Sequence, residues 1–195
     1  MEERTLSEQE SLKLIGQVIG EAKNFFYETG LSSLILGFCS AICMLLAYGI
    51  ARGMSFPFNP FYLMLPAVLV QGYLAMKEER RKPVKTFTDR AIDMVWSGYF
   101  LTVLTFTICA AIAGLGNIIF TVLLFLTGFA CFVTGAISKF SYMIIASLLV
   151  MAMGALTIFI EGPTIYLLCA ASAILVWIIP GFIMRSYFKK LHPNV

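Results

Sequence analysis

Residues that could carry out chemistry are few in this chain of 195 residues, and they do not group into a site. Cys39 and Cys43 stand four residues apart, which places two thiols on one helix face as two candidate zinc ligands. A zinc site needs further ligands, and the one histidine, His192, lies near the end of the chain. We expect all five cysteines to act as small apolar residues, with no disulfide and no bound metal.

Motifs of hydrolases and nucleotide-binding proteins are also missing. The chain contains no HExxH, no GxSxG and no glycine-rich phosphate loop with its lysine. Arg90, Asp93, Lys139 and Glu161 stand at the expected ends of apolar segments, so no carboxylate pair or proton relay is expected inside a membrane. The sequence therefore predicts no enzyme activity, no catalytic residue and no cofactor.

The distribution of charge indicates the class of protein. Only 25 residues are charged, 14 basic and 11 acidic, while 59% of the chain is apolar. Between positions 94 and 184 the only charged residues are Lys139 and Glu161. A water-soluble domain could not cover its surface with so few charges. This pattern predicts a polytopic membrane protein and argues against a nucleic-acid binder, a secreted disulfide scaffold or a soluble enzyme.

Hydropathy predicts an all-α fold, a bundle of six transmembrane helices preceded by a cytoplasmic amphipathic helix. One crossing takes about 20 apolar residues. The expected spans are 31–50, 59–76, an uncharged stretch 94–138 that breaks in two at 114–117, 140–160, and a last helix to position 184. The expected organisation is an N-terminal helix in 1–30, a membrane domain 31–186 with a basic loop 77–93, and a tail 187–195. Pro66 and Pro180 are expected to bend the second and sixth helices.

The basic residues predict how the bundle is oriented. Six crossings put both termini on one side, and that side collects 13 of the 14 basic residues, leaving Arg52 alone on the other. Because basic residues accumulate on the cytoplasmic side of a membrane, both termini are expected to be cytoplasmic.

The cytoplasmic segments suggest an interaction surface. Residues 7–28 have the apolar stripe of an amphipathic helix. Residues 1–28 have a net charge of −3, whereas residues 77–90 have a net charge of +3. The helix could rest on the bilayer surface, dock on the basic segment or bind a soluble protein, and the basic cluster could serve only to fix topology. The candidate surface consists of Arg80, Arg81, Lys82, Lys85, Glu21 and Glu28.

Small and polar residues inside the expected spans are the remaining candidates for helix contacts or a functional site. Ser33, Gly37 and Ala41 repeat every four residues, which favours close helix packing, either within one chain or between two copies. The intramembrane polar positions singled out are Gln71, Thr102, Thr134 and Trp177.

Two stretches resemble a family of small bacterial six-helix inner-membrane proteins without an established activity. In residues 124–140 the similarity rests on Gly128, Phe132, Thr134, Gly135, Lys139 and Phe140. The last span, with Trp177, Pro180 and Gly181 before Arg185, is also similar, as is the Glu10-Ser11-Leu12 entry into the amphipathic helix. The resemblance implies the fold and a bacterial inner (cytoplasmic) membrane, but no reaction.

Two functions are compatible with these features. The first is a non-catalytic scaffold or regulatory component that acts through its cytoplasmic surface on a protein partner. The second is a small transporter or channel for a neutral or apolar solute, which predicts a wet cavity around Gln71, Thr102 or Thr134. The expected partners are the lipid bilayer, a cytoplasmic protein and a second copy of the chain, and no nucleic acid.

Overall fold

The computed structural model describes residues 30–79 and 87–191, and the regular elements in this part of the chain are all helices, without strands. The elements in chain order are α2 (Gly30–Ala51), the short 3-10 helix η2 (Pro60–Leu63), α3 (Met64–Glu79), α4 (Phe87–Ile112), α5 (Gly116–Ile137), α6 (Ser141–Leu156), α7 (Thr164–Ala173), the π-helix η3 (Ile174–Ile178) and α8 (Ile179–Leu191). The predicted all-α class is confirmed. The predicted amphipathic helix lies outside the described residues.

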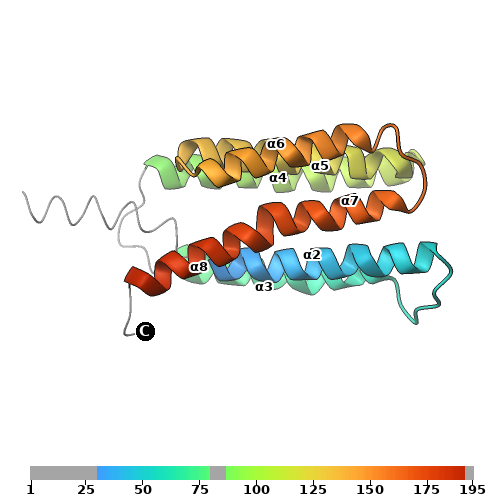
Figure 1. Ribbon diagram of the computed structural model, residues 1–195, viewed down its shortest axis with the longest axis horizontal. Coiled ribbons are helices and arrows are strands. Elements are labelled where there is room, and N and C mark those ends of the chain that lie inside the picture. Colours follow the sequence, from blue (N-terminus) through green and yellow to red (C-terminus); the bar gives the residue numbers. More distant parts are fainter. Residues whose placement is uncertain (1–29, 80–86, 192–195) are drawn as a thin grey trace, which may run out of the picture.

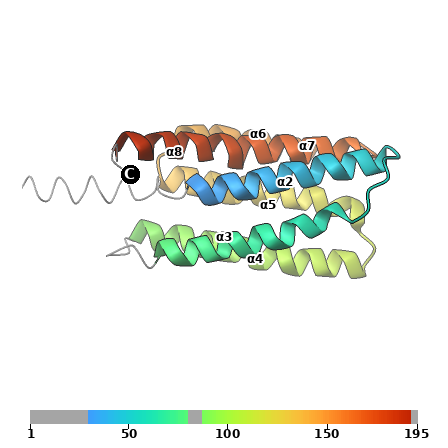
Figure 2. The same cartoon turned by 90° about the horizontal axis from the view of Figure 1, so that it is seen from below.

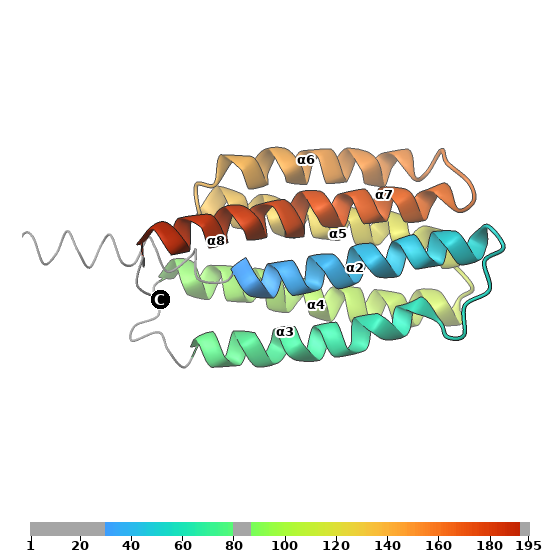
Figure 3. The same cartoon turned by 60° about the horizontal axis from the view of Figure 1, so that its bottom comes forward.

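The helices run alternately up and down and form two rows (Figure 1). One row contains α4, α5 and α6; the other contains α3 and α2, with the continuous rod of α7, η3 and α8 beside α2 (Figures 2 and 3). This rod contacts α2 along its length and also contacts α5 and α6, so it joins the rows. Helices α3 and α4 share an edge of the bundle, but α3 packs on α2 and α4 packs on α5.

Helices α5 and α6 share the most extensive contact of the helix pairs in the described residues, and small residues lie along it. A β-carbon added to Gly135 would lie 3.1 Å from the backbone nitrogen of Ile144, and one added to Gly128 would lie 3.1 Å from the carbonyl oxygen of Ser147. Cys131 and Val150, on the two facing helices, are fully buried. The close packing predicted for the stripe Ser33, Gly37 and Ala41 is found on another pair, where a β-carbon added to Gly37 of α2 would lie 2.7 Å from Cβ of Trp177 in η3.

Three helices end with the same hydrogen-bonded turn, which explains the short connections. After α2, α4 and α5 a backbone N–H bonds the carbonyl five residues earlier, at 2.9–3.0 Å, as in a Schellman motif. The residue before each donor has positive φ: Gly53, Gly114 and Lys139. The predicted breaks near Gly53 and at 114–117 are confirmed, and Lys139 fills a place that usually takes glycine.

Helix lengths only partly match six crossings. Four helical stretches are long and apolar enough to cross a membrane: Gly30–Ala51, Phe87–Ile112, Ile118–Ile137 and Thr164–Ser186. The other two, α3 and α6, have 16 residues each, or about 24 Å of helix. The chain is thus an all-α protein with several helices compatible with a membrane, and six spans are not established by helix length.

Several predicted boundaries need correction. Only residues 80–86 of the predicted loop 77–93 lie between α3 and α4, because both helices continue through charged residues outside the apolar segments. The last helix likewise passes the predicted limit at 186 and ends at Leu191. Pro66 lies in the first turn of α3, directly after the 3-10 helix Pro60–Leu63.

Candidate functional site

The four intramembrane residues singled out by sequence lie on four different helical elements. Gln71 lies on α3 and is partly buried, Thr102 is exposed on α4, Thr134 on α5 is 3% exposed, and Trp177 in η3 is 9% exposed. Within residues 30–79 and 87–191, no hydrogen bond or ring contact joins any two of them. They do not form one site.

The hydroxyl groups among them bond their own helices. Thr102 Oγ1 donates to the carbonyl oxygen of Gly98 at 2.7 Å, and Thr134 Oγ1 donates to that of Ala130 at 2.7 Å. The buried serines Ser147 and Ser172 do the same over three residues, each at 2.7 Å. Such bonds are common for hydroxyls in apolar helices, and they leave no hydroxyl proton free for a solute.

Trp177 belongs to an aromatic cluster that was not predicted. Its ring lies 5.1 Å from that of Trp96 on α4, and the Trp96 ring also contacts those of Tyr99 and Phe100 at 5.3 and 6.2 Å. The Tyr99 hydroxyl is 2.9 Å from that of Thr127 on α5. We call these four rings the tryptophan cluster. It connects α4 to the rod of α7, η3 and α8.

The backbone beneath Trp177 is irregular. Residues 174–178 form a π-helix, and the N–H of Ile179 bonds the carbonyl oxygen of Ile174. Pro180 follows immediately and has no N–H to donate. The carbonyl of Leu175 instead accepts a hydrogen bond from the Tyr142 hydroxyl of α6 at 3.2 Å. Single π-turns of this kind are rare and occur often at functional positions.

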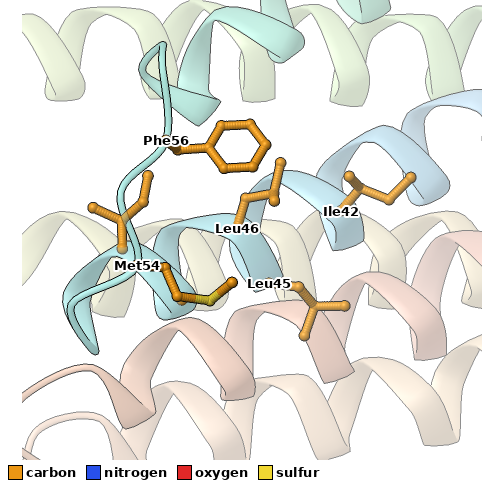
Figure 4. A pocket seen from close by; sticks show the side chains of 7 residues that line it. Ile42, Leu45, Leu46, Met54 and Phe56 are labelled. Atoms are coloured by element: carbon orange, nitrogen blue, oxygen red, sulfur yellow. The ribbon is translucent and has the colours of Figure 1, made fainter.

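Two hollows lie at the end of the bundle that carries the 52–59 connection. The first, of about 200 Å³, lies between α2 and this connection and is lined by Ile42, Leu45, Leu46, Gly49, Ile50, Met54 and Phe56 (Figure 4). The second, of about 520 Å³, is open and is lined largely by residues 56–61 together with Tyr166. Neither is lined by Gln71, Thr102, Thr134 or Trp177. The wet cavity expected of a transporter is therefore not formed by these two hollows.

Titratable groups do not gather into a metal site within the described residues. The five cysteines are free thiols, and Cys43, Cys131 and Cys169 are buried. Cys39 and Cys43, the pair with helical ligand spacing, lie on α2 without a histidine or carboxylate beside them to complete a group of three.

All six residues of the predicted cytoplasmic surface lie outside the described residues. Arg80, Arg81, Lys82 and Lys85 belong to residues 80–86, and Glu21 and Glu28 to residues 1–29. Their described neighbours, Lys77 at the end of α3 and Arg90 at the start of α4, are exposed.

Comparison with known proteins adds no residue to this description. No protein-family model, no curated protein and no solved structure matched the chain. The candidate features are therefore the tryptophan cluster with its π-helix and the charged end of the bundle.

Proposed function

We propose that this chain is a six-helix protein of the bacterial inner membrane, with both termini in the cytoplasm. In this proposal it is a non-catalytic scaffold or regulatory component that binds a protein partner through its cytoplasmic end. The bacterial assignment comes from the sequence resemblance, and the remainder is argued from the placement of charge and the packing of the interior.

The sorting of charge between the two ends of the bundle is the observation that carries the proposal. At the end where α3 and α5 finish and α4 and α6 begin, the described basic residues are Lys77, Arg90, Lys139, Arg185, Lys189 and Lys190. The opposite end has Arg52 and Glu161. Glu78, Glu79, Asp89 and Asp93 lie at the basic end as well, but the positive-inside rule counts Lys and Arg, and six of these against one is the bias that it describes.

The packing of the interior favours a protein that binds a partner over one that transports a solute. Thr134, Ser147 and Ser172 are buried and bond backbone carbonyls of their own helices. Most of the remaining core is aliphatic, aromatic or cysteine. A solute pathway needs unpaired polar groups that line a cavity, and the two hollows described above lie at one end of the bundle and not at its centre.

The two short helices can still cross the bilayer in this proposal. The 3-10 helix Pro60–Leu63 extends α3 to 20 helical residues, and the apolar residues 157–160 continue beyond α6. A span that is slightly short is accommodated by local thinning of the membrane, at modest cost. Six crossings then place both short hairpin ends, 77–90 and 138–140, on the side of the termini.

The first prediction concerns this topology. If α3 and α6 cross the membrane, Lys139→Cys introduces a cytoplasmic thiol, and an impermeant maleimide added to intact cells leaves it unlabelled. If only the four longer stretches cross, the same thiol lies outside and is labelled. The measurement is labelling before and after lysis, with the unsubstituted chain giving the background of its five cysteines.

Glu161→Cys is the matched control for this labelling experiment. Position 161 lies in the turn between α6 and α7, at the opposite end from Lys139, and Glu161 is exposed. It faces outward in the four-span and six-span arrangements alike, so its thiol is labelled in intact cells in both. Labelling of Lys139→Cys before lysis, to the level of Glu161→Cys, would overturn the six-span proposal.

The second prediction concerns the cytoplasmic surface. The acidic segment 1–28 and the basic segment 77–90 carry net charges of −3 and +3, so we propose that the first docks on the second. Replacing Arg80, Arg81 and Lys82 by glutamate should release the N-terminal segment. Loss of one or two kcal/mol of docking energy raises the open population about 5–30-fold, and proteolysis accelerates accordingly.

The measurement is the rate of chymotrypsin cleavage at Phe25, Phe26 and Tyr27 in inside-out vesicles, because the charge reversals change no chymotrypsin site. Reversal of Arg185, Lys189 and Lys190 changes the same number of charges at the same end and controls for total charge. Equal cleavage rates in the Arg80, Arg81 and Lys82 variant and the unsubstituted chain would show that the docking contact does not exist.

A further inference from the structure

The carbonyl oxygen of Leu175 lacks the backbone donor that a regular helix would supply. In an α-helix it would accept from the N–H of Ile179, but that N–H bonds Ile174 in the π-helix. In a continued π-helix it would accept from residue 180, which is proline. Both backbone donors are therefore lost at the same carbonyl.

Tyr142 supplies the missing donor from another helix. Its hydroxyl lies 3.2 Å from the Leu175 carbonyl oxygen, a long hydrogen bond for a hydroxyl donor. An unpaired carbonyl in the apolar interior costs free energy. The Tyr142 hydroxyl therefore stabilises the π-helical register, in which no backbone N–H bonds the Leu175 carbonyl. In the α-helical register Ile179 would occupy this carbonyl, and the hydroxyl would lose its role.

The π-helix and the start of α8 each make a close contact with α2. A β-carbon added to Gly37 would lie 2.7 Å from Cβ of Trp177, and one added to Gly30 would lie 2.8 Å from the carbonyl oxygen of Gly181. One glycine contact therefore precedes Pro180 and one follows it. A π-turn holds one more residue than an α-helical turn, so its conversion to α-helix would rotate α8 by roughly a quarter turn against α7. This rotation would separate at least one of the two glycine contacts with α2.

We propose that residues 174–180 are a hinge with two registers, in which Tyr142 is the positioning residue that holds the π-helical one. Release of the Tyr142 hydroxyl allows the segment to become α-helical, which turns α8 and the basic residues at its end. The Trp96–Trp177 contact changes at the same time, because Trp177 lies within the converting segment. This inference does not depend on the proposed function.

The test is a double-substitution cycle between Tyr142→Phe and Pro180→Ala, in detergent micelles. Tyr142→Phe alone is expected to lower the melting temperature by about 2–4 °C, the shift for one hydrogen bond in a chain of this size. In the Pro180→Ala background it is expected to have an effect below about 1 °C, because alanine restores a backbone N–H. An equal drop in both backgrounds would overturn the proposal.

Two further measurements separate the hinge from a simple loss of a hydroxyl. Tyr99→Phe removes the bond to Thr127, so it should lower the melting temperature equally with and without Pro180→Ala. The two tryptophans of the chain lie 5.1 Å apart, so their exciton signal in circular dichroism reports the register. Tyr142→Phe is expected to reduce this signal at least by half; an unchanged signal would mean that the hydroxyl controls no change of register.

Discussion

Gly37→Ala is expected to destabilise the bundle by about 1–3 kcal/mol, the usual cost of forcing an additional methyl group into a packed contact. The new β-carbon would lie 2.7 Å from Cβ of Trp177 and 3.1 Å from the backbone nitrogen of Ile178. Neither atom is the end of a flexible side chain, so relief requires α2 and the π-helix to move apart. The measurement is unfolding in mixed micelles of increasing denaturing-detergent content, followed by far-ultraviolet circular dichroism.

Gly72→Ala provides the matched control. Gly72 lies within α3, and a β-carbon added there meets no atom within 4 Å. The substitution also removes the conformational entropy of a glycine in a helix, so it is expected to leave stability unchanged or raise it by about 0.5–1 kcal/mol. If both substitutions have the same effect, close contact at Gly37 is not what determines stability there.

The sequence predicted the helical hairpins because their signals are local. Glycine at positions 53 and 114 marks two of the chain reversals, and both residues adopt positive φ in the structure. Lys139 marks the third, since a charge within an apolar stretch of that length has to lie at a membrane surface. Hydropathy did not locate the helix ends, because it detects apolar segments and a helix can continue beyond them. Helix α4 already begins at Phe87, and α8 continues through charged residues to Leu191.

The candidate site could be predicted only in part, because its parts come from distant segments. Trp177 was recognised as unusual, but its contact with Trp96 depends on which faces α4 and η3 present to each other. The π-helix requires both Pro180 and a donor from α6, and no local pattern places the Tyr142 hydroxyl beside Leu175. Thr102 and Thr134 are polar positions in the sequence, but each hydroxyl donates to the backbone carbonyl four residues earlier in its own helix.

Trp177→Ala is expected to destabilise the protein by about 3–5 kcal/mol, as truncation of a large buried ring does elsewhere. The ring is 9% exposed and packs on Trp96, so its removal leaves a void between α4 and the rod of α7, η3 and α8. Few other contacts join α4 to that rod, since α4 packs mainly on α5. Detergent unfolding followed by far-ultraviolet circular dichroism measures the loss, because this signal does not depend on the tryptophan removed.

Two controls isolate the packing of this ring. Trp177→Phe keeps an aromatic ring and removes less of the buried side chain, so its cost should be clearly smaller than that of Trp177→Ala. Leu101→Ala removes an apolar side chain that is 68% exposed on α4, and its effect should be about 0.5 kcal/mol or less. If Trp177→Ala costs no more than Leu101→Ala, the tryptophan cluster does not hold α4 in place. The contact between α4 and α5 alone would then have to position that helix.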